Sequence, residues 1–502
     1  MAASSTSVTL LPHVASQPIR FLLNHRVVEI DNLAPTTTIL NFLRQDASRK
    51  GTKEGCAEGD CGACTVVTGE LRNDRLELKA VNACMQFLPT LDGKALFTVE
   101  DLRANDGKLH PVQQAMRDCH ASQCGFCTPG FVMSLWALYL RKIENDTCAS
   151  ADEQVVRQAI TGNLCRCTGY RPIIEAGMRM CETPAVDLDR GALTVALKAL
   201  VRKDVLRYRH KEENFYAPRN LAELTALRKQ LSSATLLAGG TDVALWTNKQ
   251  LRDLGDIIYT GEVTELLKIE ENATQLVIGA AVSLSDAQAA LRSCYPEMNE
   301  MWERFASTPI RNAGTLGGNI ANGSPIGDSM PALIALGAEV ELASAELSRR
   351  MPLEDLYIAY QQKALRADEV VTAVRIPKRT PATRFRIYKL SKRFDSDISA
   401  VCGAFAMELQ GDRITHCRIA FGGMAATPRR ALHAEKALLG AQCNEATIRG
   451  AMEAMSSDYA PLSDMRASAE YRIRSARNLL YRFYLETRPV NALAAGELNV
   501  FA

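Results

Sequence analysis

The segment Glu54-Gly55-Cys56-Ala57-Glu58-Gly59-Asp60-Cys61-Gly62-Ala63-Cys64 concentrates glycine and cysteine in a loop that no regular helix or strand accommodates. Residues 18–30 before it have the pattern of two short strands, and residues 36–45 that of a helix with a threonine cap. After it, residues 65–99 return to strand-like runs. The sequence therefore predicts a small α+β unit wrapped around a cysteine loop.

Cysteine spacing in this unit indicates an iron-sulfur site. Cys56, Cys61 and Cys64 form the pattern Cys-x4-Cys-x2-Cys, and Cys84 follows after nineteen further residues. This is plant-type 2Fe-2S spacing, with three thiolates from one loop and a fourth from a distant strand. Zinc is the alternative, but structural zinc sites usually combine two closely spaced pairs. We expect the cluster.

Four further cysteines lie in a segment with helical periodicity, which predicts a compact bundle. The predicted helices cover residues 112–120, 129–143, 151–161 and 171–181. The cysteines at the helix ends are Cys124, Cys127, Cys165 and Cys167. A Cys-x-Cys pair is uncommon in zinc sites, although spacing alone leaves a zinc or structural role open.

Composition narrows the class of protein. The 502 residues are 47% hydrophobic and 23% charged, as in soluble globular proteins, and the length suggests three or four domains. The 59 basic and 57 acidic side chains nearly cancel, which argues against binding to nucleic acid or anionic lipid. Because no apolar run is long enough to span a membrane and no charged signal region precedes Arg20, we expect a cytoplasmic protein.

The cysteines cluster in the first part of the chain, where 11 of the 15 lie between Cys56 and Cys181. In a reducing compartment we expect thiols or metal ligands rather than disulfides. Three of them are expected to be buried thiols without a role: Cys119, Cys148 and Cys181.

Two glycine-rich turns mark the later part of the chain. The first turn, residues 236–243, has the pattern of a strand, a glycine turn and the start of a helix. This arrangement directs backbone N–H groups at a pyrophosphate. The second comprises residues 314–320 and is followed by residues 324–328. Neither is a GxGxxG fingerprint, and double glycines usually mark ordinary turns.

The residues around both cysteine sets resemble those of xanthine dehydrogenases and related molybdenum hydroxylases. Gln123-Cys124-Gly125-Phe126-Cys127-Thr128-Pro129-Gly130 and Gly162-Asn163-Leu164-Cys165-Arg166-Cys167-Thr168-Gly169-Tyr170-Arg171-Pro172-Ile173 resemble the second cluster motif of that family. The segment that ends at Cys64, with Val81-Asn82-Ala83-Cys84, resembles its ferredoxin-like motif. The resemblance extends from about Pro18 to Pro489 and implies that all eight cysteines ligate iron, four for each cluster.

Both glycine turns resemble FAD-binding segments of the same family. The match implies FAD contacts from Leu236, Leu237, Ala238, Gly239, Gly240, Thr241, Asp242, Val243, Thr315, Leu316, Gly317, Gly318 and Asn319. Asp328 would hold a hydroxyl, and Phe305 would lie near the flavin ring, with core packing as the alternative. Lys389 matches a lysine close to the cofactor, where a cation favours the anionic reduced flavin. Residues 392–398 resemble a loop beside the ring less closely.

The resemblance also implies a function, because the chain matches the separate small subunit of the bacterial enzymes. Electrons from the oxidation of hypoxanthine and xanthine to urate would leave a molybdopterin-binding large subunit. They would pass the cluster of the helical domain, then the ferredoxin-like cluster, then FAD, and end on NAD. A heterotetramer of two small and two large chains is expected. We name no catalytic acid or base in this chain, and His110, His120 and His416 are expected to be structural.

Other functions remain open at this point. The partner selects the substrate, so an aldehyde, nicotinate or carbon monoxide hydroxylase is an alternative. A non-enzymatic redox sensor or scaffold and a zinc-binding interaction module are two more. Fusion of iron-sulfur and flavin parts in one chain favours the xanthine interpretation.

The expected fold is multidomain α+β. A ferredoxin-like β-grasp domain covers residues 16–104, an all-helical four-helix 2Fe-2S domain residues 105–184, and a linker residues 185–208. A FAD-binding domain of the vanillyl-alcohol-oxidase/PCMH type covers residues 209–382. A C-terminal α+β domain like that of the CO dehydrogenase flavoprotein covers residues 383–490, with strands at 400–408 and 416–421 and helices at 431–439 and 467–485.

Overall fold

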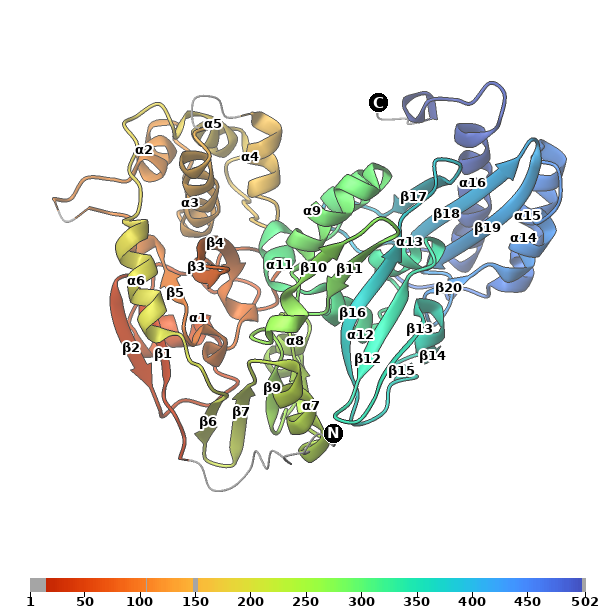
Figure 1. The fold of residues 1–502 in the computed structure, drawn as a ribbon. Coiled ribbons are helices and arrows are strands. Elements are labelled where there is room, and N and C mark those ends of the chain that lie inside the picture. Colours follow the sequence, from red (N-terminus) through yellow and green to blue (C-terminus); the bar gives the residue numbers. More distant parts are fainter. Residues whose placement is uncertain (1–14, 105, 148–151, 499–502) are drawn as a thin grey trace. The chain divides into compact units, whose positions relative to one another are not determined.

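The computed structural model describes residues 15–104, 106–147 and 152–498, which form two compact units (Figure 1). The first unit runs to Thr264 and adds the short segments Ser283–Ser285 and Ser307–Gly314. The second contains Glu265–Val282, Asp286–Ala306 and the chain from Thr315 onward. Both mix helices and strands, so the predicted multidomain α+β class is confirmed.

The first unit begins with a five-stranded sheet of order β2-β1-β5-β3-β4. Its strands are β1 (Ile19–Leu23), β2 (Arg26–Ile30), β3 (Thr65–Arg72), β4 (Arg75–Asn82) and β5 (Ala95–Phe97). β1 and β5 are parallel, and the other neighbours are antiparallel. The two strands predicted at residues 18–30 meet at Asn24, which adopts a positive φ of 58° that a tight turn requires.

The first helix starts later than the sequence suggested. Thr38 rather than Thr36 caps it, and the Thr38 hydroxyl accepts a hydrogen bond from the Asn41 N–H at 3.1 Å. α1 (Ile39–Asn41) then widens into a π-helical turn, Phe42–Asp46.

Four helices follow, as predicted: α2 (Pro111–Asp118), α3 (Thr128–Glu144), α4 (Glu153–Ala159) and α5 (Arg171–Arg179). Residue 151, the expected start of α4, lies outside the described residues. The linker contributes α6 (Arg190–Leu200), which lies beside the first sheet in Figure 1. Leu193, Leu197 and Leu200 recur at helical spacing and join one core with the strands and the bundle.

A second sheet in the first unit has the order β6-β7-β9-β8. Its strands are β6 (Leu206–His210), β7 (Glu213–Ala217), β8 (Thr235–Leu237) and β9 (Ile257–Tyr259). The accompanying helices are α7 (Leu221–Gln230), α8 (Val243–Asn248) and α11 (Thr308–Ala313). Phe21 and Phe87 of the cysteine-loop domain share one core with Phe215 and Ile257 of this sheet. The first glycine turn is therefore built into the same unit as both cysteine sets.

The second unit contains a five-stranded sheet of order β10-β11-β16-β12-β13. Its strands are β10 (Ile269–Glu271), β11 (Gln275–Gly279), β12 (Glu339–Ala343), β13 (Ser348–Pro352) and β16 (Val370–Pro377), with a separate hairpin of β14 (Tyr357–Ala359) and β15 (Gln362–Lys363). The helices of this part are α9 (Leu284–Cys294), α10 (Asn299–Arg304), α12 (Leu316–Asn322) and α13 (Ser329–Ala335).

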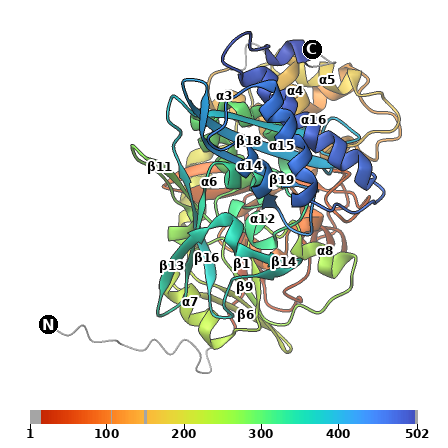
Figure 2. The ribbon, with the colours of Figure 1, turned by 90° about the vertical axis from the view of Figure 1, so that its right-hand side faces the viewer.

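The last sheet has the order β17-β18-β19-β20. Its elements are β17 (Arg384–Leu390), β18 (Val401–Gln410), β19 (Arg413–Gly422) and β20 (Arg429–Arg430), followed by α14 (Leu432–Leu438), α15 (Glu445–Asp458) and α16 (Ala469–Thr487). Strand alternation explains the layers: Val401, Phe405 and Met407 face the core made with α14–α16, while the Cys402 thiol donates to the Asp328 carbonyl on the other face. Figure 2 shows the three helices over β18 and β19.

Within the described part of the chain, no helix combines the length and apolar character that a bilayer crossing requires.

Candidate iron-sulfur and flavin sites

The first cysteine set comes together as two pairs of thiols. The Sγ atoms of Cys64 and Cys84 are 3.3 Å apart, and the thiols of Cys56 and Cys61 share a hydrogen bond. Backbone N–H groups surround the Cys56 sulfur at 3.3–3.4 Å; they belong to Glu58, Asp60 and Cys61. Such donors stabilise a thiolate.

Each pair contains one thiol with a lowered pKa and one with a raised pKa. The hydrogen bond from Cys61, helped by the backbone N–H groups and opposed by burial, lowers the pKa of Cys56 to about 5. The pKa of Cys61 is raised by the same bond and by burial. Likewise the bond to Cys84 lowers the pKa of Cys64, and that of Cys84 is raised. Each pair therefore contains one thiol that ionises more readily than its partner.

This arrangement fits a 2Fe-2S cluster. Two irons need two pairs of thiolates, one pair on each iron, and the four sulfurs are grouped in that way. A single zinc ion needs its ligands around one point. Among the described residues, no three His, Cys, Asp or Glu side chains converge in that manner.

The second cysteine set repeats the pairing. Cys127 is hydrogen-bonded to Cys165, and Cys124 to Cys167. Burial, then the bond to Cys165, raises the pKa of Cys127 to about 12. Burial opposes ionisation of Cys165, but hydrogen bonds, first from Thr168, lower its pKa. Since Cys124 and Cys167 are exposed, this set lies at the surface of the unit.

The two sets are in direct backbone contact. Gly62 has a φ of +66°, and a Cβ at this position would collide with the carbonyl of Gly162, so only glycine fits. The N–H of Leu164, next to Cys165, donates to the carbonyl of Cys61 at 3.0 Å. The sequence placed these motifs in separate domains, and nothing in their spacing revealed this junction.

The structure differs from the expectation of buried free thiols at Cys119 and Cys181. Cys119 is half-buried rather than buried, and the Arg179 guanidinium donates a hydrogen bond to its sulfur at 3.7 Å. Cys181 is in a disulfide, so the expectation of a free thiol there is wrong. Cys148 lies outside the described residues. The structural role expected for His110 holds, since its Nδ1 caps α2 by accepting from the Val112 N–H at 3.2 Å.

The first glycine turn leads from β8 into α8, as predicted. Leu236 and Leu237 end the strand, and Val243 opens the helix. A Cβ at Gly239 would collide with the Ala313 carbonyl, so this glycine permits close backbone packing. Within the described contacts, the N–H groups of residues 241–243 have no protein partner, which leaves them available to an anion. These donors fit an FAD phosphate.

The second turn differs, because the protein itself already uses most of its backbone N–H groups. Thr315 caps α12, and its hydroxyl accepts from the Gly318 N–H at 3.0 Å. The N–H groups of Leu316 and Gly317 donate to the carbonyls of Val282 and Ala280, and that of Asn319 donates to Thr315. The N–H groups of residues 316–319 are therefore not available to a phosphate, whereas no partner is described for the N–H of Thr315. The two turns belong to different compact units.

Lys389 and Asp328 form a buried ion pair in the second unit. The Lys389 ammonium also donates to the Ser399 hydroxyl at 2.8 Å, and Ser399 donates to Asp328 Oδ1 at 2.5 Å. All three side chains are almost fully buried. The Asp328 carboxylate thus balances the charge of Lys389. Lys389 would therefore stabilise a nearby anionic flavin less than an unpaired lysine would. Ser399 directly follows the loosely matched loop of residues 392–398, and the sequence analysis did not identify it.

Phe305 follows α10 and packs edge-to-face on Trp302 at 5.6 Å. Phe305 is half-buried, so part of its surface is accessible to solvent or to a ligand. Arg304, the last residue of α10, stacks on Phe394 of the loop 392–398 at 4.6 Å and donates to the Phe394 carbonyl at 3.0 Å. This contact fixes the loop that was expected beside the flavin ring.

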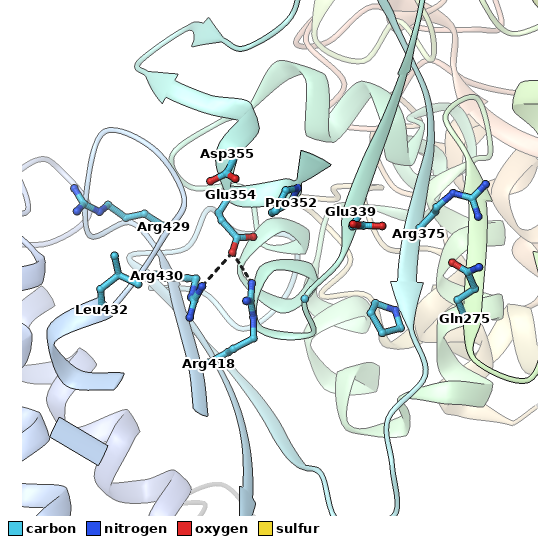
Figure 3. A pocket seen from close by; sticks show the side chains of 12 residues that line it. Gln275, Glu339, Pro352, Glu354, Asp355, Arg375, Arg418, Arg429, Arg430 and Leu432 are labelled. Carbon is cyan, nitrogen blue, oxygen red and sulfur yellow. Dashed lines mark hydrogen bonds and ion pairs between the residues drawn. The ribbon is translucent and has the colours of Figure 1, made fainter. Parts of the chain in front are cut away.

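A separate polar cavity of about 620 Å³ lies in the second unit between the ends of β11, β12 and β16 and the strands β19 and β20. Figure 3 shows Arg418 and Arg430 both reaching Glu354, at 2.6 and 3.3 Å. None of the residues predicted to hold FAD lines it. Its lining includes four arginines and three acidic residues, among which Glu354 pairs with Arg418 and Arg430.

Comparison with known families assigns four domains along the chain. The matches are a 2Fe-2S iron-sulfur cluster binding domain at residues 21–88, a [2Fe-2S] binding domain at 98–178, an FAD binding domain in molybdopterin dehydrogenase at 209–379, and a CO dehydrogenase flavoprotein C-terminal domain at 386–487.

Individual relatives agree with these assignments. Xanthine dehydrogenase of Emericella nidulans is 31% identical over 96% of this chain and 39% of its own length. Among solved structures, a carbon monoxide dehydrogenase from Hydrogenophaga pseudoflava matches with 29% identity and a TM-score of 0.51, over 53% of this chain and 94% of that one. Quinoline 2-oxidoreductase from Pseudomonas putida 86 matches with 26% identity and a TM-score of 0.50, over 55% and 97%.

The chain spans about two fifths of the curated relatives' length. Its domains nevertheless occur together and in one order, iron-sulfur first and flavin second, and the thiol pairs and the turn geometry suit those groups. The chain belongs to the molybdenum hydroxylase family and carries its iron-sulfur and FAD domains.

Proposed function

We propose that this chain is the electron-transfer subunit of a xanthine dehydrogenase, taking electrons from a molybdopterin-bearing partner and delivering them to NAD in the cytoplasm. One 2Fe-2S cluster would be held by Cys124, Cys127, Cys165 and Cys167, and the other by Cys56, Cys61, Cys64 and Cys84. FAD would be held by the glycine turns and the residues around Asp328 and Lys389. Clusters exchange single electrons and FAD can also exchange a hydride, so this set can connect a metal centre with a nicotinamide.

The junction between the cysteine sets carries this proposal. The hydrogen bond from the Leu164 N–H to the Cys61 carbonyl, 3.0 Å long, links a neighbour of Cys165 with a ligand of the other set. A continuous path of covalent and hydrogen bonds therefore connects the two sites. Two zinc sites would not exchange electrons, so they would not require such a path.

The exposed side of the second set supports docking of a partner there. Cys124 and Cys167 are accessible, and Phe126 and Leu164 beside them expose 48% and 46% of their surface. Exposed apolar side chains around a redox site are typical of an interface. We propose that the molybdopterin subunit covers this surface, in a heterotetramer of two small and two large chains.

Xanthine is the proposed substrate class of the partner because the relatives named xanthine dehydrogenase match across both iron-sulfur and flavin domains. The solved carbon monoxide and quinoline enzymes match only about half of the chain. An enzyme acting on another substrate with the same electron-transfer part is the second candidate. NAD is proposed as acceptor since FAD releases a hydride, with oxygen as the alternative.

The decisive experiment is purification of the complex from its native cell, with iron, molybdenum and flavin measured on one sample. We expect about four irons and one FAD for each copy of this chain. A large molybdenum-bearing partner and xanthine-dependent reduction of NAD are expected as well. Zinc in place of iron would overturn the proposal, and activity with another substrate class alone would support the second candidate.

A further inference from the structure

The end of α8 in the flavin domain is bonded to the ligands of the first cysteine set. The Asn248 side-chain Nδ2 donates to the carbonyl of Cys84 at 2.8 Å and to that of Ala57 at 3.3 Å. One amide therefore holds both parts of the set, the loop that begins at Cys56 and the distant fourth cysteine. Next to it, the Lys249 ammonium donates to the Cys56 carbonyl at 2.6 Å.

The other end of this helix adjoins the first glycine turn, and the same cysteine segment contacts that end as well. Gln86, two residues after Cys84, donates its side-chain Nε2 to the Gly239 carbonyl at 2.8 Å. A Cβ at Gly240 would lie 2.7 Å from the Met85 carbonyl. The six residues of α8 thus connect a turn proposed for FAD with a clamp on the cluster ligands.

The charge at this clamp has a predictable effect on a cluster. Reduction adds a negative charge, and a nearby cation stabilises the reduced form, so hydrogen bonds and charge around the ligands raise the reduction potential. Lys249 supplies a cation at the Cys56 carbonyl, attenuated by its ion pair with Glu58 at 3.4 Å and by 43% exposure of its side chain. Asn248 supplies no charge but fixes two ligand segments together.

We propose that Asn248 and Lys249 are positioning residues for the first cluster. Asn248 sets the distance between Cys84 and the cysteine loop, and Lys249 raises the reduction potential of that cluster relative to the other. This inference rests on the proposed function, since it requires the cluster to be present.

The test uses the full chain in complex with its partner and a redox titration followed by electron paramagnetic resonance. Lys249→Gln is expected to shift the potential of one cluster to lower values and leave the other in place, and Lys249→Arg is expected to restore it. Arg252→Gln is the matched control, because Arg252 is an exposed cation nearby that stacks on Trp246 and has no described contact with the cysteine loop. It is expected to shift neither potential.

Asn248→Leu, similar in size, tests the positioning role. It is expected to change the resonance line shape of the same cluster and slow its reduction by NADH, with iron and FAD content retained. Unchanged potentials in Lys249→Gln, or equal shifts in Arg252→Gln, would overturn the inference even if Asn248→Leu fails to fold. Absence of both cluster signals from the wild-type complex would instead overturn the proposed function.

Discussion

The Asn163 side-chain amide donates a hydrogen bond to the Gly62 carbonyl at 3.0 Å and thereby joins the two cysteine motifs. The same Nδ2 donates to the Thr65 hydroxyl at 3.1 Å, and Oδ1 accepts from the Ser134 hydroxyl at 2.7 Å. Only 3% of Asn163 is exposed, so water cannot replace these bonds. One buried side chain therefore adds three hydrogen bonds at the junction where the Leu164 N–H also donates to the Cys61 carbonyl.

Asn163→Leu keeps the size of this side chain and removes its polar atoms. We expect the free energy of unfolding to fall by about 1–3 kcal/mol, because the Ser134 hydroxyl loses its described acceptor and the Gly62 carbonyl loses a donor. Urea denaturation of the full chain, followed by circular dichroism, measures the change. Asn145→Leu is the control, since Asn145 is exposed at the end of α3. Equal midpoints for the two variants would contradict this reading of the junction.

Cys165→Ser tests the proposed order of carriers. Serine lacks the soft sulfur that an iron-sulfur cluster requires, so we expect loss of about two irons per chain and of xanthine-dependent NAD reduction. Oxidation of NADH by an artificial acceptor at the flavin should remain near the wild-type rate. Iron analysis and both assays on the purified complex provide the measurement. Cys119→Ser should keep both activities, and loss of NADH oxidation in folded Cys165→Ser with full FAD would argue against the order.

The cysteine sets could be predicted because ligand spacing within a loop is local in sequence. The contacts that bring the sets together could not, since Asn163 and Gly62 are 101 residues apart and a buried amide leaves no periodic pattern. The same holds for Asn248, 164 residues from Cys84.

The glycine turns show a different limit of the sequence. Both look alike as strings, yet the N–H groups of Leu316 and Gly317 are consumed by the carbonyls of Val282 and Ala280. The partners of a backbone donor depend on tertiary contacts, which glycine content does not encode. Within the final domain, β17 and α15 were also not predicted, although Arg384 to Ile387 of β17 alternate arginine with apolar residues as a strand does.

Lys389→Met tests the buried ion pair in the second unit. The variant leaves Asp328 buried with its lysine partner removed, and loss of one member of a buried pair costs about 3–5 kcal/mol. We expect a lower thermal midpoint for the full chain, and a partial recovery in Lys389→Met/Asp328→Asn, which also removes the carboxylate charge. Differential scanning calorimetry of the two variants measures this. If the double variant were the less stable of the two, the pair would not be the source of the loss.

His110 should make the first unit less stable at acidic pH. Burial lowers its pKa to about 4, from 6.5 for an ordinary histidine. Well above pH 6.5 the ring is neutral in both the folded and the unfolded chain, so it does not change the free energy of unfolding. As the pH falls from 6.5 to 4, the His110 ring becomes protonated in the unfolded chain but stays neutral in the folded chain. The free energy of unfolding therefore declines by up to about 3 kcal/mol.

The substitution His110→Asn separates this effect from other titrations. The side-chain oxygen of the introduced asparagine can still accept the Val112 N–H bond that caps α2, but the amide carries no titratable proton. We therefore expect His110→Asn to lose less stability than the wild-type chain between pH 7 and pH 5, as measured by urea midpoints. His120→Asn provides the comparison, because His120 is exposed at the end of the same helix and leaves the pH dependence set by His110 in place. Parallel pH profiles for wild type and His110→Asn would show that burial of His110 does not destabilise its charged form.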